Sequence, residues 1–141
     1  MLTSGKFYFV KFDNSVMTST TGTIFEGEYL IKVRDIDDDS ISIYIAGFGN
    51  IIIPESYIEE FELVENHMFN RENIMRARNS DLLKQTLRVV GKGYNIYSLF
   101  ETHLNVEILT FINGDILFRD DTGIVRIMQS YMCKRIEQKG E

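Results

Sequence analysis

The strongest constraint on the fold of this chain is a short pattern that occurs twice. Residues 49–58 read GNIIIPESYI, and residues 123–132 read GIVRIMQSYM. Both segments begin with glycine, carry apolar residues at alternate positions and contain a Ser-Tyr pair, which ends at Tyr57 in one copy and at Tyr131 in the other. Self-similarity of this kind indicates an internal duplication. The 141 residues should therefore form two similar units of about 60 residues each, a size at which burial is marginal and the units are expected to lean on each other.

Runs of β-branched and aromatic residues, bounded by Gly, Asp, Asn and Ser, predict a mainly β architecture. In the first unit, strands are expected at residues 6–12, 29–36, 41–45, 51–53 and 60–64, with a long polar loop at 13–28 and a helical turn at 54–58. In the second unit, strands are expected at residues 85–90, 106–112 and 116–119, and a closing strand around residue 136. Asn113-Gly114 is a strong signal for a tight hairpin between two of these strands.

The segment between the two units has a different character. Met68, Met75 and Leu82 recur every seven residues, with asparagine and arginine on the opposite side, and this pattern predicts an amphipathic helix over residues 65–84. The expected domains are an acidic first unit at 1–64, a connecting helix at 65–84 and a second unit at 85–141. The helix is expected to pack across both units and to cover exposed sheet edges.

The order of elements in the first unit resembles the Src-homology-3-like (SH3-like) small barrel. One strand, a long loop, three short strands, a helical turn and a last strand follow one another, and residues 54–57 (PESY) look like the Pro-x-x-Tyr that such domains carry before their final strand. The resemblance covers residues 6–64. It implies a mainly β (α+β) fold of two SH3-like small antiparallel barrels joined by the helix. In the second copy of the motif, Met128 replaces the proline.

Peptide-binding members of the SH3-like class grip proline-rich ligands in an aromatic groove. The resemblance places such a groove at Tyr8, Pro54 and Tyr57. The tryptophan that is usual in this groove is missing, because the chain contains none, and the long loop carries few acids, Glu26 and Glu28 among them. The fold alone therefore does not decide the function.

Charge is unevenly distributed along the chain. The net charge is −6, and residues 1–64 carry eleven acids against four bases, whereas residues 65–141 carry ten acids against eleven bases. An acidic first unit repels a phosphate backbone and attracts a basic protein partner. The residues expected to bind that partner are Asp35, Asp37, Asp38, Asp39, Glu55, Glu59, Glu60 and Glu62, together with Tyr8, Pro54 and Tyr57.

The alternative is nucleic-acid binding through a basic face of the connecting helix and the second unit. The arginines that would carry it are Arg71, Arg76, Arg78 and Arg126.

Motifs for catalysis, metals or cofactors are weak. Asp35, Asp37 and Asp39 match the opening of a calcium loop, but Ser40 and Ala46 stand where that loop needs glycine and a bidentate glutamate. The two histidines, His67 and His103, have no acid or cysteine partner at a recognisable spacing, and the lone Cys133 is expected to be a passive thiol. We therefore expect no enzyme activity, no metal and no cofactor.

One segment of the second unit is unusually apolar for a loop. Tyr94, Ile96, Tyr97, Leu99 and Phe100 follow the expected strand at 85–90. Side chains of this kind must be covered. The candidates are the first unit, the connecting helix or another molecule, and in the last case these residues would form an oligomer interface.

The N-terminus lacks the apolar core of a secretory signal, and no apolar run approaches the roughly 20 residues that span a bilayer. The protein is therefore expected to be cytoplasmic and not membrane-bound. The sequence predicts a non-catalytic protein-binding module or inhibitor that modulates a host enzyme. Its richness in isoleucine and asparagine is typical of proteins encoded by phages or mobile elements in AT-rich genomes.

Overall fold

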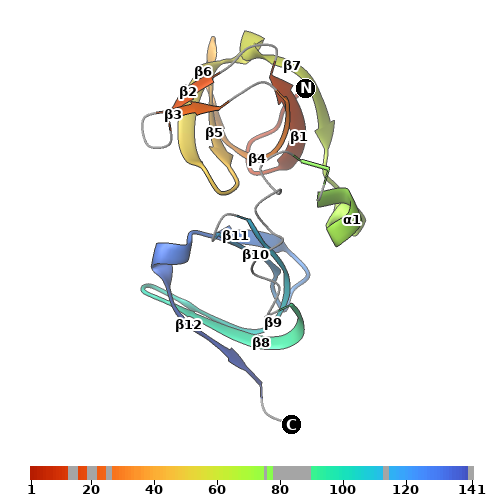
Figure 1. Cartoon of the computed structure of the whole chain (residues 1–141), viewed down its shortest axis with the longest axis vertical. Helices are drawn as coiled ribbons and strands as arrows, with labels where there is room; N and C mark the ends of the chain where they lie inside the picture. Colours follow the sequence, from red (N-terminus) through yellow and green to blue (C-terminus); the bar gives the residue numbers. More distant parts are fainter. Residues whose placement is uncertain are drawn as a thin grey trace.

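The computed structural model describes residues 1–12, 16–18, 22–24, 27–74, 76–77, 90–112 and 115–139. The fold is mainly β, as the sequence predicts, and consists of two five-stranded antiparallel sheets with a small two-stranded ribbon. Figure 1 shows the first sheet above the second, with each sheet strongly curled.

The first sheet contains the strands expected in residues 1–64. Its members are β1 (Phe7–Phe12), β4 (Gly27–Ile36), β5 (Ser40–Ile45), β6 (Gly49–Pro54) and β7 (Ile58–Leu63). They lie in the order β6-β5-β4-β1-β7, and the 3-10 turn η1 (Glu55–Tyr57) connects β6 to β7. Within the expected long loop, the described residues form an antiparallel pair, β2 (Val16–Thr18) and β3 (Gly22–Ile24).

The second sheet repeats this topology. Its strands are β8 (Gly91–Ser98), β9 (Thr102–Ile112), β10 (Asp115–Arg119), β11 (Val125–Met128) and β12 (Cys133–Gln138). Their order, β11-β10-β9-β8-β12, is that of the first sheet when strands are counted within each sheet. The turn η4 (Ser130–Met132) connects β11 to β12 as η1 connects β6 to β7. The duplicated sequence pattern therefore occupies the same place in both sheets.

Strand alternation explains how one sheet contributes to two cores. In β1, Tyr8, Val10 and Phe12 enter the core of the first sheet, whereas Phe7 and Phe9 face the other way and enter a core between the sheets. The strand β4 behaves similarly: its Tyr29, Ile31 and Val33 lie in the first core and its Leu30 lies in the intersheet core. The aromatic residues on both faces of β1 therefore all have apolar partners.

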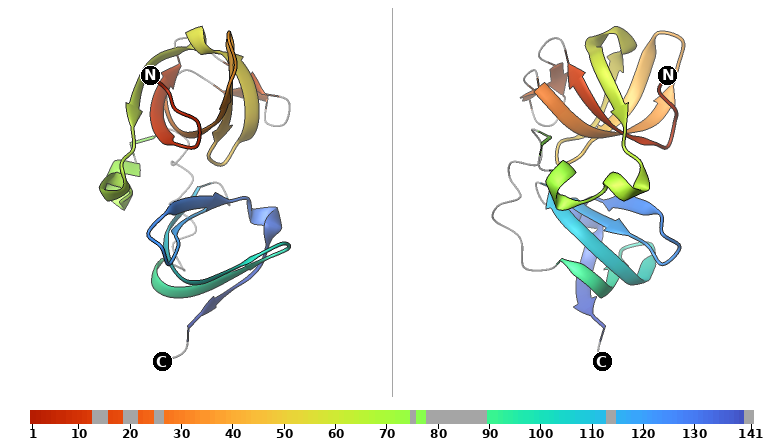
Figure 2. Two further views of the ribbon diagram at one scale, coloured as in Figure 1. Left: turned by 180° about the vertical axis from the view of Figure 1, so that it is seen from behind. Right: turned by 90° about the vertical axis from the view of Figure 1, so that its right-hand side faces the viewer.

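The intersheet core holds the two sheets together. The first unit contributes Phe7, Phe9, Leu30, Ala46 and Val64 to this core. The connecting segment contributes Phe69, Ile74 and Ala77. The second sheet contributes Ile112 and Leu117, with Leu109, Phe111, Val125 and Ile127 packed alongside. A separate core inside the second sheet is built on Ile96, Val106, Ile108 and Phe118. The described start of the connecting segment, residues 65–74, lies at the level of this junction (Figure 2).

The described residues of the connecting segment contain two short helical elements. They are the 3-10 turn η2 (Asn66–Met68) and the four-residue helix α1 (Arg71–Ile74). Residues 78–89 lie outside the described part of the chain, so the longer helix over 65–84 stays a prediction. The strand expected at 85–90 falls almost entirely on the same undescribed stretch.

The prediction of an apolar loop is wrong for Tyr94, Ile96 and Tyr97, which belong to β8, whereas Leu99 and Phe100 lie at the turn that follows this strand. This strand pairs with both β9 and β12. Its Ile96 is completely buried in the second core and Ser98 is also buried, so the segment follows the two-residue period of a strand. Among the described residues, the first strand of the second sheet is therefore β8, in a segment for which the sequence predicts a loop.

Candidate functional site

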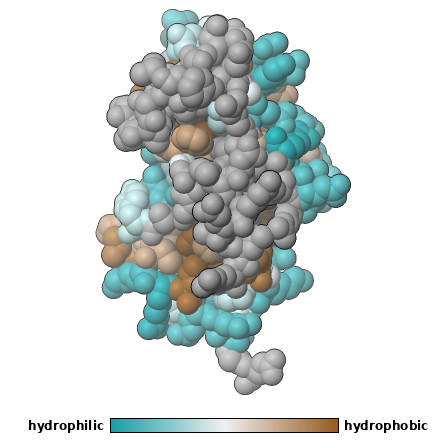
Figure 3. All heavy atoms as spheres, in the orientation of Figure 1, coloured by the Kyte–Doolittle hydropathy of each residue, from teal (hydrophilic) through white to brown (hydrophobic). Residues whose placement is uncertain are grey.

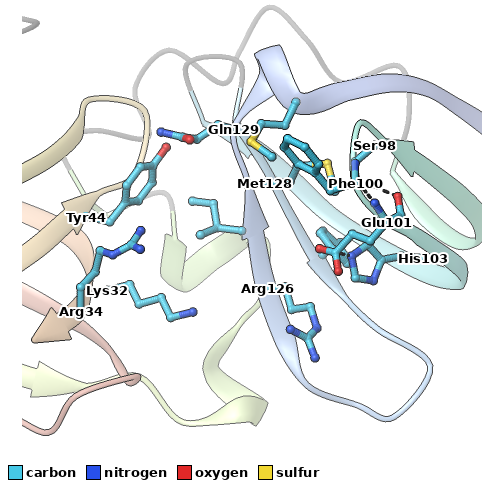
Figure 4. A pocket seen from close by; sticks show the side chains of 13 residues that line it. Lys32, Arg34, Tyr44, Ser98, Phe100, Glu101, His103, Arg126, Met128 and Gln129 are labelled. Carbon is cyan, nitrogen blue, oxygen red and sulfur yellow. Dashed lines mark hydrogen bonds and ion pairs between the residues drawn. The ribbon is translucent and has the colours of Figure 1, made fainter.

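A groove lies beside the intersheet core and is lined by residues of both sheets. We call it the intersheet groove and define it by Lys32, Arg34 and Tyr44 of the first sheet and by Phe100, His103 and Arg126 of the second. Its volume of about 450 Å³ lies in the range of about 300–1,000 Å³ that is typical of ligand sites. Figure 4 shows Lys32, Arg34 and Tyr44 extending toward the strand that carries Arg126, with Phe100 and His103 beyond it.

The side of the groove formed by β4 follows from strand alternation. Leu30 packs in the intersheet core, and the next residues on the same face are Lys32 and Arg34. The half-buried Lys32 places its Nζ 5.6 Å from the ring centre of Phe7, and the exposed Arg34 donates a long hydrogen bond of 3.4 Å to Asn50 Oδ1. Within the described residues, neither Lys32 nor Arg34 forms an ion pair.

The strand β11 brings a third cation to the groove. Arg126 lies opposite Phe118 in the β10–β11 register, and its Nε donates to Asp120 Oδ2 at 2.6 Å. Hydrogen bonds from Thr122 and from Arg126 hold the pKa of the Asp120 carboxyl well below its usual range. The charge of Arg126 is therefore shared with a carboxylate of its own sheet, unlike the charges of Lys32 and Arg34.

Lys32 lies in a positive electrostatic environment that the two arginines create. Burial lowers the pKa of the Lys32 ammonium, and the neighbouring positive charges of Arg34 and Arg126 lower it further. The two arginines come from different sheets, so this positive environment exists only because the sheets are docked. An anion in the groove would relieve the repulsion.

The opposite wall is built by the turn between β8 and β9. The Ser98 hydroxyl donates to the carbonyl of Glu101 at 2.8 Å and accepts from the backbone amide of the same residue at 3.0 Å. Phe100, at the tip, keeps 83% of its surface exposed. The Glu101 Oε1 and His103 Nε2 atoms lie 3.0 Å apart, and the ring centres of His103 and Phe118 lie 5.0 Å apart. His103 thus has the acidic partner that the sequence did not reveal, two positions earlier along an extended segment.

A buried polar contact next to the groove joins the sheets. The Tyr44 hydroxyl donates a hydrogen bond to Asp115 Oδ2, and the backbone amide of Gly47 donates to the same oxygen at 3.0 Å. Asp115 is only 7% exposed. Burial raises the pKa of Tyr44 well above its usual range, and the hydrogen bond to Asp115 raises it further. We call this pair the Tyr44–Asp115 latch.

A second polar bridge lies at the connecting segment. Arg119 donates through Nε to Asn66 Oδ1 at 3.0 Å and through Nη1 to Glu107 Oε1 at 2.7 Å. Asn66 Nδ2 donates to the carbonyl of Gly123 at 3.1 Å. The groove is therefore formed between two sheets whose relative position is fixed by an apolar core and by two sets of hydrogen bonds.

The acids that the sequence proposes for partner binding lie mainly at the end of the β4–β5 hairpin. Asp35, Asp37, Asp38 and Asp39 are all exposed there, and the β5–β6 register places Pro54 opposite Ser40 beside them. Tyr57 is also exposed, as are Glu55, Glu59, Glu60 and Glu62. Tyr8 is the exception. It is 3% exposed, and its hydroxyl accepts a hydrogen bond from the amide of Thr3, so it is a core residue and its assignment to the binding surface is corrected.

The arginines proposed for nucleic-acid binding do not share one described surface. Arg76 lies 4.0 Å from the ring centre of Phe9 and forms ion pairs with Glu28 and Glu62, whereas Arg126 lies in the groove. Arg78 and the side chain of Arg71 lie outside the described part of the structure. Lys32 and Arg34 are not among the residues proposed for binding from the sequence. The signal that could have found them is their spacing, because residues two positions apart on the strand expected at 29–36 share one face.

Of the apolar residues proposed as an interface, only two are well exposed. Ile96 is in the second core, and Tyr94 and Tyr97 are half-buried. Leu99 and Phe100, at the β8–β9 turn, are 52% and 83% exposed. In Figure 3, hydrophobic atoms are visible at the left edge of the lower half, where Figure 1 places the end of this hairpin.

Within the residues that the structure describes, no group of three or more His, Cys, Asp or Glu side chains is placed to hold a metal ion. None of the helices in this part of the chain is long and apolar enough to cross a membrane. Comparison with protein-family models, with curated proteins and with solved structures finds no match.

Proposed function

We propose that the protein is a non-catalytic protein-binding module that docks a segment of a partner protein in the intersheet groove and thereby modulates that partner. The observation that carries the proposal is that one site contains both exposed apolar surface and cations that form no ion pair within the described residues. Phe100 is exposed at one wall, with the exposed Leu99 next to it in the chain, and Lys32 and Arg34 stand at the other wall. Aromatic and arginine side chains are enriched in protein interfaces.

The architecture supports this role. We propose that the two sheets are SH3-like small barrels, because each has five antiparallel strands in the same order and a 3-10 turn before its last strand. We propose domain boundaries at 1–64 and 85–141 on the same grounds. The docked pair presents a groove that neither sheet would form alone. The acidic end of the β4–β5 hairpin is a second proposed contact surface, for a basic segment of the same partner.

The proposal is tested by selecting binders from a random peptide library displayed on a surface, with the folded full-length protein as bait. We expect the wild type to enrich related peptides and Phe100→Ser to lose this enrichment. Leu104→Ser is the matched control, because Leu104 is also an exposed apolar residue, at 56%, but lines neither the groove nor the acidic end of the β4–β5 hairpin. The proposal is wrong if the wild type enriches nothing, or if Phe100→Ser and Leu104→Ser behave alike.

The same preparation tests the nucleic-acid alternative. Labelled DNA and RNA that bind at low salt, and are released steeply as salt is added, would favour that alternative, provided that replacing Arg76, Arg78 and Arg126 abolishes binding. We expect no such binding, because Arg76 and Arg126 are already engaged with carboxylates.

A further inference from the structure

We propose that the occupant of the intersheet groove is an acidic segment of the partner protein, with carboxylates at Lys32 and Arg34 and an apolar side chain against Phe100. This inference rests on the proposed function and names the chemistry of the partner. It is the opposite of what the net charge of −6 predicts, since an overall acidic protein would be expected to attract a basic partner.

The first step is the charge of the groove itself. Its described acids are already engaged: Glu101 faces His103, and at the adjoining latch Asp115 accepts from Tyr44. Asp120, beside the groove, binds Arg126. Lys32 and Arg34 are left without a carboxylate partner among the described residues. The groove therefore offers two free positive groups and no free negative one among the residues that define it.

The second step is geometry. A guanidinium presents parallel N–H donors that match the two oxygens of a carboxylate, whereas an ammonium acts as a point charge. Arg34 is exposed, and among the described residues its guanidinium is held by a single hydrogen bond, of 3.4 Å, to Asn50, so it is available for a new partner. Lys32 and Arg34 stand two positions apart on β4, which spaces two binding points along an extended ligand.

The third step is the apolar part of the groove. Phe100, Phe118, Met128 and Met132 line it, and Phe100 is largely exposed. A simple anion would not use these side chains, whereas an acidic peptide with an aromatic or aliphatic residue would. Methionine side chains adapt readily to different apolar partners.

Phosphate groups of a nucleic acid share the anionic chemistry, but the surroundings disfavour them. The strand that carries Arg34 continues into the exposed acids Asp35, Asp37 and Asp39, which would repel a phosphate backbone leaving the groove. A short acidic peptide that does not extend beyond the groove avoids this repulsion. The observations therefore favour a protein segment.

The test measures binding of fluorescent synthetic peptides by anisotropy. The probe is a short peptide that repeats Glu-Glu-Phe, compared with Gln-Gln-Phe and Lys-Lys-Phe peptides of the same length. We expect the Glu-Glu-Phe peptide to bind best. Arg34→Glu should weaken its binding about tenfold to a hundredfold, the loss expected for hydrogen bonds to a charged group. The same variant should improve binding of the Lys-Lys-Phe peptide.

Lys92→Glu is the matched control, because Lys92 is exposed on β8, lies outside the groove and undergoes the same change of charge. It should alter binding less than about threefold. Arg34→Gln removes the cation without adding an acid and serves as a second variant if Arg34→Glu does not fold, with folding checked by circular dichroism. Equal effects of Arg34→Glu and Lys92→Glu would show only a general charge effect and would overturn the inference.

The outcomes separate this inference from the proposed function. If the display selection enriches peptides but they are not acidic, or do not respond to Arg34, the protein is a peptide-binding module and the carboxylate assignment is wrong. If the selection enriches nothing and the Glu-Glu-Phe peptide does not bind, both fail. If a single-stranded oligonucleotide binds in an Arg34-dependent manner and no peptide does, the occupant is a nucleic acid and the inference is overturned.

Discussion

The Tyr44–Asp115 latch gives the sharpest test of how the two sheets are joined. In the variant Tyr44→Phe the ring keeps its shape, and the hydroxyl that donates to a nearly buried carboxylate is lost, together with its hydrogen bond to the Gln129 side chain. A hydrogen bond to a charged group contributes about 1.5–3 kcal/mol. Because the Gly47 amide still donates to Asp115, we expect the lower part of this range, about 2 kcal/mol of unfolding free energy.

The loss is measured by urea unfolding followed by circular dichroism, and by calorimetry. For a chain of this size, about 2 kcal/mol corresponds to a decrease in melting temperature of roughly 6 °C. Asp115→Asn and the double variant complete a cycle that isolates the energy of the pair. Tyr131→Phe is the control, because Tyr131 is 71% exposed and its replacement should change stability by less than about 0.5 kcal/mol.

The latch also predicts a pH dependence. Its environment raises the pKa of Tyr44 in the folded state, so the neutral hydroxyl is the stabilising form. The contribution is fully present below the unfolded pKa of about 10 and is lost as the pH rises toward the folded pKa. The difference in stability between wild type and Tyr44→Phe should therefore shrink above about pH 10. A Tyr44→Phe protein as stable as wild type at pH 7 would refute the reasoning.

Three further predictions concern other parts of the fold. Leu117→Ala, in the intersheet core, should cost about 2–5 kcal/mol in urea unfolding, and a cost below about 1 kcal/mol would contradict tight packing. Hydrogen bonds from Thr122 and Arg126 lower the pKa of Asp120, so its carboxylate stabilises the fold above about pH 4. The difference in unfolding free energy between wild type and Asp120→Asn should therefore decrease as the pH is lowered to about 2. Burial raises the pKa of the Cys133 thiol, so a maleimide should react more slowly at pH 7 with the folded protein than with the urea-unfolded chain, and equal rates would disprove this.

Local patterns were sufficient for most strands. The alternation in residues 29–36 and 41–45 predicted β4 and β5, and the run at 106–112 predicted most of β9. The strands β9 and β10 pair around the Asn-Gly signal, with Ile112 opposite Asp115. In each case the strand is indicated by residues only one or two positions apart, and this spacing can be seen in the sequence.

The pattern failed where two interpretations of similar apolar residues competed. Residues 94–98 carry the aromatic and β-branched side chains of a strand, but the preceding run at 85–90 offered an earlier candidate. Only pairing with β9 and β12 identifies β8 as Gly91–Ser98. The prediction that Tyr8 lies at a binding surface is wrong for a similar reason. A tyrosine on a strand suits both a core and a binding surface, and the T-shaped packing of its ring against Phe61 depends on the neighbouring strand β7.

The sequence by itself determined the repeat, the mainly β character and the placement of Lys32 and Arg34 on one face of a strand. All of these depend on short-range spacing, because side chains in a strand alternate with a period of two. Only the tertiary structure decided that this face meets the strand of Arg126 and that Asp115 reaches Tyr44, 71 positions away. Such contacts depend on how two separately formed sheets dock, and docking is set by the combined shape of many apolar side chains, which no local pattern encodes.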